Sequence, residues 1–137
     1  MPLWIVYSLG AMAFLAAMTL MFVPVTRSTP PSVVLFYLFV AVAIVNFGYL
    51  RYQGTPLNVS TTGLLWILAA ALASFCGNLC NLNAIKLAPN AGYAAAIEAS
   101  KAPVVVLMAA LLFAQHLSFT KGLGAALCAI GVALLSL

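Results

Sequence analysis

Two charged side chains stand together in the most apolar part of this chain. Glu98 and Lys101 lie within the run from Gly92 to Ala114, and Glu98 is the only acidic residue in the sequence. Residues three positions apart share a helix face, so the carboxylate and the ammonium can reach each other. An ionisable residue at membrane depth costs about 2.5–3.5 kcal/mol and by default indicates a functional site. We therefore predict that the pair faces protein or a watery cavity rather than lipid.

The pair has two interpretations. It can be a substrate or coupling-ion site facing a central cavity, or a structural ion pair that locks helix packing. A buried ion pair is often no more stabilising than an apolar replacement, which favours the functional interpretation. Pro103 follows closely and has no backbone N–H, so we expect it to kink the helix and free a carbonyl near the pair.

A second polar group lies on an otherwise apolar segment. Ser74, Asn78 and Asn81 recur at spacings of four and three residues, which places them along one helix face. These side chains could line the same cavity as Glu98 and bind a polar solute. They could equally bond across helices, since Ser and Asn commonly do so in membranes for about 0.6–2 kcal/mol. Both interpretations stay open.

Small residues form a stripe near the C-terminus. Gly124, Cys128 and Gly131 fall on one side of the last apolar segment. Small residues let membrane helices approach closely, so this stripe predicts packing against a neighbouring or partner helix rather than chemistry.

The composition explains which elements must position these residues. The chain is 66% hydrophobic and only 4% charged, whereas a soluble domain carries about 25% charged residues. The chain has too few polar side chains to cover the surface of a water-soluble protein. Turn signals cut the 137 residues into apolar segments near the length of about 20 residues that a bilayer requires. We predict an all-α membrane protein, in contact with the lipid bilayer.

Five spans can be placed within a single transmembrane domain, residues 1–137. Pro24, the pair Pro30–Pro31, the polar loop after Arg51 and Pro89 separate the first four. The connections are short, so successive helices should be antiparallel neighbours. The predicted spans are residues 3–23, 32–50, 62–85, 92–114 and 119–137.

Several function classes are not supported. The five basic residues are scattered singly and form no phosphate-tracking patch, so we expect no nucleic-acid partner. No catalytic triad, phosphate loop or metal-ligand cluster is present, so we predict no enzymatic activity, no metal and no cofactor. Four of the basic residues fall between or beside apolar runs and indicate interface anchors, whereas Lys101 lies inside the run that contains Glu98. The five basic residues are Arg27, Arg51, Lys86, Lys101 and Lys121.

The C-terminal part carries a family resemblance. Residues 83–103 contain a short A-x-K turn that leads into a small-residue helix with a proline. Residues 111–118 read L-L-F-A-Q-H-L-S, close to an L-L-x-G-E-x-L-S motif, and residues 124–132 have the pattern G-x-x-L-x-x-x-G-V in the last helix. This course resembles the EamA-like drug/metabolite transporter superfamily. The first two spans agree with that superfamily in hydropathy and spacing.

The chain departs from the family pattern at two places. The usual loop glutamate is Gln115, and the common Glu-Pro of the fourth helix is Ala102–Pro103, with the acidic residue at Glu98 instead. Lys101 lies where sugar-phosphate and nucleotide-sugar branches carry a lysine, which would imply an anionic substrate. The resemblance also implies two inverted five-helix repeats with the site between them, as in many secondary transporters.

This chain has one such repeat, so we expect a half-size unit that completes itself as a homodimer. Basic residues are divided almost evenly between the two sides, which is compatible with insertion in both orientations and an antiparallel dimer. The expected function is secondary transport of a small polar or amphipathic metabolite, coupled to protons through Glu98. The expected location is the cell membrane, in a bacterium the inner membrane. The alternative is a non-transporting membrane subunit or assembly factor.

Overall fold

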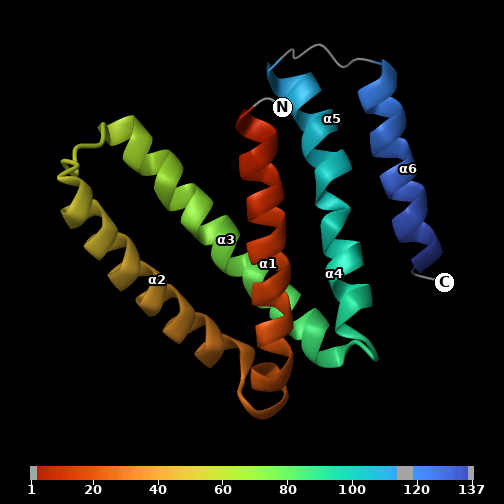
Figure 1. Ribbon diagram of the computed structural model, residues 1–137, viewed down its shortest axis with the longest axis horizontal. Coiled ribbons are helices and arrows are strands. Elements are labelled where there is room, and N and C mark those ends of the chain that lie inside the picture. The colour runs from red at the N-terminus through yellow and green to blue at the C-terminus, as the bar shows by residue number, and fades with distance from the viewer. Residues whose placement is uncertain (1–2, 114–118, 136–137) are drawn as a thin grey trace. The chain divides into compact units, whose positions relative to one another are not determined.

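The computed structural model describes residues 3–113 and 119–135, and these are helical almost throughout. Figure 1 shows the helices in chain order. Their bounds are α1 (Leu3–Ser28), α2 (Pro31–Gln53), α3 (Thr61–Leu87), α4 (Ala91–Ala99), α5 (Lys101–Phe113) and α6 (Phe119–Leu135). The predicted all-α class is confirmed. Gln115, named above for the loop, lies outside the described residues.

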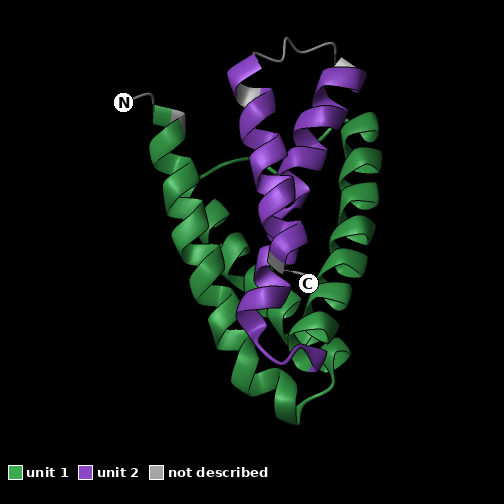
Figure 2. Ribbon diagram, turned by 90° about the vertical axis from the view of Figure 1, so that its right-hand side faces the viewer, with its two compact units in different colours: residues 1–86 green, residues 87–137 purple. Residues whose placement is uncertain are grey.

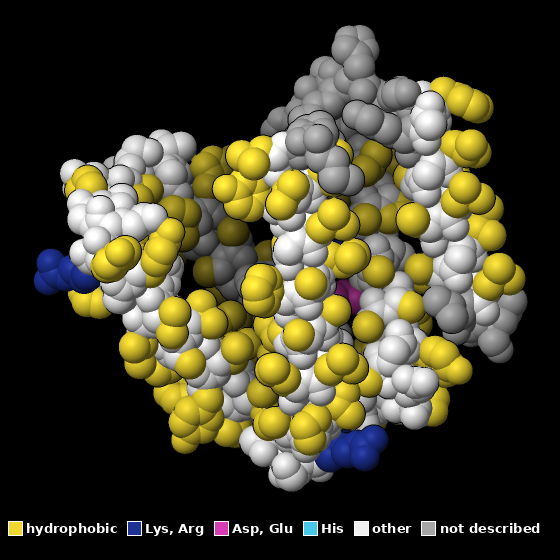
Figure 3. Space-filling view, viewed as in Figure 1, with side chains coloured by type: hydrophobic (Ala, Val, Ile, Leu, Met, Phe, Trp, Pro, Cys, Tyr) yellow, Lys and Arg dark blue, Asp and Glu magenta, His cyan; other side chains and the backbone are white. Residues whose placement is uncertain are grey.

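Four helical stretches are long and apolar enough to cross a membrane, and a fifth is shorter. The long ones are Ile5–Ser28, Pro31–Gln53, Thr61–Leu87 and Ala91–Leu112, and the shorter one is Gly122–Leu134. Figure 3 shows hydrophobic side chains along the helices in that view. This arrangement fits the five-helix membrane protein that the sequence predicts. The bilayer boundaries of the spans and the single domain stay predictions.

The chain divides into two compact units, which Figure 2 colours separately. Unit 1 is Met1–Lys86 and holds α1, α2 and all of α3 except the last residue of that helix. Unit 2 is Leu87–Leu137 and holds α4, α5 and α6. The candidate residues are therefore distributed between the units. The Ser74 stripe belongs to unit 1, and the Glu98–Lys101 pair belongs to unit 2.

Prolines shape the turn between α1 and α2. The helix α1 continues through Pro24 to Ser28, past Val23, the predicted end of the first span. Just beyond Pro24, the Thr26 hydroxyl donates to the Phe22 carbonyl at 2.9 Å from a fully buried position. Pro31 then occupies the first turn of α2, where a missing N–H costs nothing.

The buried side chains of unit 1 gather near the ends of its helices. They lie on the last turns of α1, the first turns of α2 and the last turns of α3: Phe22, Thr26, Pro31, Val34, Leu35, Leu82 and Ile85. Most other large apolar side chains of the described chain are exposed. A water-soluble protein could not leave so much apolar surface uncovered, whereas lipid can cover it.

Unit 2 packs a broken helix against α6. Both α4 and α5 contact α6, and Figure 1 shows α5 continuing from the end of α4. On α4, Ala94 is buried, and on α5, Pro103 is buried with Val106 and Ala110 half-buried beyond it. These residues follow helical spacing, so they mark the packing face of the broken helix.

Candidate functional site

The break between α4 and α5 is made by Ser100. Its backbone N–H donates to the Ile97 carbonyl at 3.1 Å, and its hydroxyl donates to the same oxygen at 2.6 Å. That N–H bond reaches back three residues instead of the four of an α-helix, so it tightens the last turn. The carbonyl of Ile97 is thereby occupied by Ser100, and α4 ends at Ala99.

Pro103 explains why the chain starts a new helix at this point. Proline cannot donate an N–H to the carbonyl four residues earlier, here that of Ala99, and its ring crowds that oxygen. In the first turn of a helix, however, the N–H has no intrahelical partner anyway. With α5 beginning at Lys101, Pro103 falls within that first turn. The sequence predicted a kink near the pair, and the structure divides the segment into two helices.

The ion pair spans this break. Lys101 Nζ donates to Glu98 Oε1 at 2.5 Å. Helical side chains lean toward the N-terminus, so the lysine reaches back over the end of α4 to the carboxylate. The side chain of Glu98 is 37% exposed and that of Lys101 is 65% exposed within the described protein. The pair is therefore open on one side rather than enclosed by its own unit.

The pair lies near the middle of a membrane-length segment. The apolar stretch Ala91–Leu112 has 22 residues. At about 1.5 Å per residue it extends roughly 33 Å, and Lys101 lies about 15 Å from its start. Charges at that depth are costly in hydrocarbon, so each member of the pair reduces the cost of burying the other.

The polar stripe on α3 bonds within its own helix. The side-chain amide of Asn78 donates to the Ser74 carbonyl at 2.8 Å and to the Ser74 hydroxyl at 3.2 Å. Asn81 is half-buried one turn further on. Helix-internal bonds already satisfy the amide N–H of Asn78, so this amide does not act here as a link between helices. A cavity shared by this stripe and the ion pair stays a prediction.

The small-residue stripe of α6 faces away from its packing partners. Gly124, Cys128 and Gly131 are exposed, and a Cβ added at either glycine would meet no atom within 4 Å. The half-buried residues of α6 are instead Gly122, Ala125 and Val132. We did not predict this packing face of α6 from the sequence, although Gly122 and Ala125 are small residues about one helical turn apart, as the members of the predicted stripe are.

Three surface hollows of the described chain lie on α2 and its neighbours, and Glu98 and Lys101 line none of these three. One is at the turn after α2, around Arg51. Another is apolar and aromatic, with Phe36, Phe39 and Phe75 in its wall. Among residues 3–113 and 119–135, no group of three His, Cys, Asp or Glu side chains could hold a metal ion.

Comparison with known proteins places the chain in a family. The model of the EamA-like transporter family matches residues 2–137, which is nearly the whole sequence and includes the first two spans. The comparisons with curated proteins and with solved structures each gave no match. Members of this family are membrane transporters of the drug/metabolite type rather than enzymes. The chain is a multi-pass membrane protein that belongs to the EamA-like transporter family.

Proposed function

We propose that this protein is a secondary transporter that exchanges protons for a small polar or amphipathic metabolite and works as a dimer of half-size repeats. The observation that supports this best is the Glu98–Lys101 pair, at a helix break in the middle of a 22-residue apolar stretch. Secondary transporters commonly form their sites from discontinuous helices at this depth.

The chemistry of the break suggests the substrate class. A carboxylate and an ammonium offer one acceptor and one donor group, and Pro103 leaves the Ala99 carbonyl without its usual helical donor. Beyond Lys101, the helix α5 is apolar. A solute with a polar or charged group and a modest apolar part would match both features.

Proton coupling rests on the single carboxylate. Glu98 can hold a proton, bond to Lys101 or bind a cationic group of a substrate, and these three states compete. A carrier that alternates between proton-bound and substrate-bound forms exchanges one for the other. No other acidic side chain in the sequence could take this role.

A dimer would supply a second repeat. It contains one five-helix repeat, whereas the resemblance implies two repeats around one site. The exposed Gly124–Gly131 side of α6 offers a surface that a second copy could approach closely. An antiparallel pair would reproduce the inverted symmetry of a full-length carrier.

Reconstitution tests this function. The purified protein is placed in liposomes that contain a pH-sensitive dye, and amino acids, sugar phosphates and the amphipathic cation ethidium are added in turn. We expect at least one class to drive proton movement above that of protein-free liposomes. Glu98→Gln should abolish this movement, whereas Arg27→Gln, which changes a charge at the end of α1, should retain it.

Two outcomes would contradict the proposal. Undiminished proton movement in Glu98→Gln would remove this carboxylate from the mechanism. A folded protein that moves none of the compounds, and that purifies with a stoichiometric amount of a different protein, would instead favour a non-transporting subunit.

A further inference from the structure

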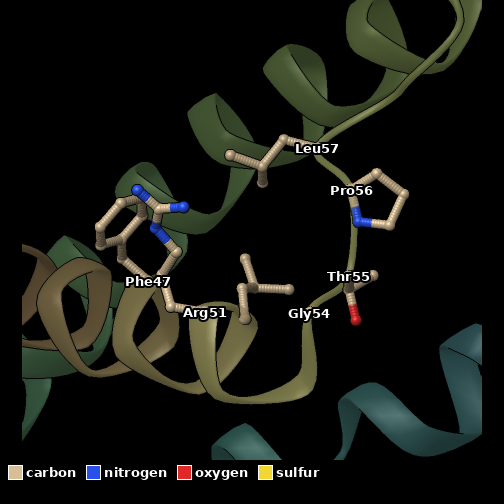
Figure 4. Close-up of a pocket in the computed structure, with 7 residues that line it drawn as sticks. Phe47, Arg51, Gly54, Thr55, Pro56 and Leu57 are labelled. Atoms are coloured by element: carbon tan, nitrogen blue, oxygen red, sulfur yellow. The ribbon is translucent and has the colours of Figure 1, made fainter.

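A pocket of about 440 Å³ lies at the turn that follows α2. Figure 4 shows the residues of its wall, with the Arg51 and Phe47 side chains on one side and the loop residues on the other. The wall consists of Phe47, Leu50, Arg51, Gly54, Thr55, Pro56 and Leu57. It is thus mainly apolar, with one guanidinium and one hydroxyl. All of these residues belong to unit 1.

The turn that forms the pocket is held by a Schellman motif. Gly54 has φ +66°, and its N–H donates to the Arg51 carbonyl while the Thr55 N–H donates to the Leu50 carbonyl, both at 3.3 Å. These two bonds satisfy carbonyls at the end of α2. Pro56 then prevents the helix from continuing. The path of the backbone along this side of the pocket is therefore fixed by two hydrogen bonds.

Arg51 is the charged group of the pocket. Its guanidinium lies 5.5 Å from the centre of the Phe47 ring, and this cation–π contact orients it. The one acidic side chain of the sequence, Glu98, is bonded to Lys101. The sequence therefore contains no second acidic side chain to neutralise Arg51, which leaves its guanidinium able to pair with an anion from outside the chain.

The position of Arg51 indicates the source of that anion. It lies in the last turn of α2, a 23-residue apolar stretch long enough to span a bilayer, and so close to the membrane surface. Tyr49 and Tyr52 flank it, as aromatic residues do at such interfaces. Phospholipid headgroups present phosphates at this level, beside glycerol and acyl carbons.

We infer that this pocket binds the headgroup of an anionic phospholipid. Arg51 would pair with the phosphate diester, and the Thr55 hydroxyl, which donates to Gln53 Oε1 at 3.3 Å, would accept a hydrogen bond from a glycerol hydroxyl of the headgroup. The apolar wall of Phe47, Leu50 and Leu57 would contact the glycerol backbone and the first methylene groups. The volume equals that of roughly fifteen water molecules at about 30 Å³ each, which exceeds what an inorganic phosphate ion needs.

A titration of fluorescent phosphatidylglycerol into the full protein in detergent micelles tests this site. A hydrogen bond to a charged group contributes about 1.5 kcal/mol, so Arg51→Gln should weaken binding about tenfold. Arg27→Gln is the matched control, because Arg27 lies in the last turn of α1 and lines none of the three hollows. It should leave the affinity unchanged. Inorganic phosphate in equal amount should not displace the lipid.

A second pair of variants keeps the test valid if Arg51→Gln does not fold. Leu57 and Val59 are both exposed in the loop, but only Leu57 lines the pocket. Leu57→Glu should weaken phosphatidylglycerol binding, whereas Val59→Glu should not. Equal effects of both members of either pair would show diffuse charge attraction and overturn the site. Displacement by inorganic phosphate would overturn the lipid as its ligand.

Discussion

Lys101 Nζ lies 2.5 Å from Glu98 Oε1, and the two residues belong to different helices of one broken span. Glu98 is in the last turn of α4, and Lys101 is the first residue of α5. A change in the angle between these two short helices would therefore alter the pair directly. This relation between a charge pair and a helix break is the basis of the first two predictions.

Exchanging the two charges separates a structural from a functional pair. The single variant Glu98→Lys places two cations one turn apart and should lower the free energy of unfolding by about 2.5–3.5 kcal/mol, the cost of an uncompensated charge in a membrane helix. Adding Lys101→Glu restores an opposite-charge pair and should recover most of that loss. Proton movement in liposomes should be absent in the double variant as well as in the single one, because the carboxylate is then on the other side of the break.

Unfolding of the single and double variants in mixed micelles gives the coupling free energy. A value near zero would mean that the two groups do not interact in the membrane. Full proton movement in the exchanged protein would contradict the importance of the carboxylate position.

Pro103→Ala should convert the broken segment into a more continuous helix. Alanine supplies an N–H that can bond to the Ala99 carbonyl, and a helix-interior proline costs about 3 kcal/mol. We expect slower amide exchange at residues 100–102 and reduced transport, with stability retained or raised. Pro31→Ala is the matched control, since Pro31 is at the start of α2 and no helix bond is missing there. Unchanged amide exchange would contradict the role of Pro103 in the break.

Gly54→Ala should destabilise the protein, whereas Gly48→Ala should not. Gly54 has φ +66°, a conformation that costs an L-residue about 1 kcal/mol. Gly48 is inside α2 with open space around it, so alanine there should gain about 0.5–1 kcal/mol from helix propensity. Opposite shifts of the thermal midpoint for the two variants are the expected result. Equal shifts would show that the turn tolerates another conformation.

Leucine at Gly131 should weaken self-association without unfolding the chain. Gly131 is exposed and a Cβ at this position meets no atom within 4 Å, so we expect a leucine to fit within one copy but to block close approach of another. Gly10→Leu on α1, which also has open space, is the control. The molar mass in detergent, measured by light scattering, should fall for Gly131→Leu alone. A dimer that persists would move the interface to another surface.

Much of the architecture could be predicted from sequence because hydropathy over about 20 residues depends on composition alone. The all-α class and the separation into apolar segments followed from the scarcity of charge and from the prolines between segments. Ser60, a residue type that favours helix N-caps, precedes α3, and its hydroxyl accepts the Gly63 N–H at 3.2 Å. The spacing of Glu98 and Lys101 likewise predicted their contact, because residues three apart meet on a helix.

Other features required the three-dimensional structure, because the sequence allowed more than one partner. Pro103 could have bent a single helix. Instead, Ser100 donates two hydrogen bonds to the Ile97 carbonyl, one from its backbone N–H and one from its hydroxyl, and the segment is divided into two helices. Small residues lie on two sides of α6, and only packing against α4 and α5 selects the side that contains Gly122. The pocket at Arg51 arises from the path of the backbone after Gly54, which no periodicity in the sequence describes.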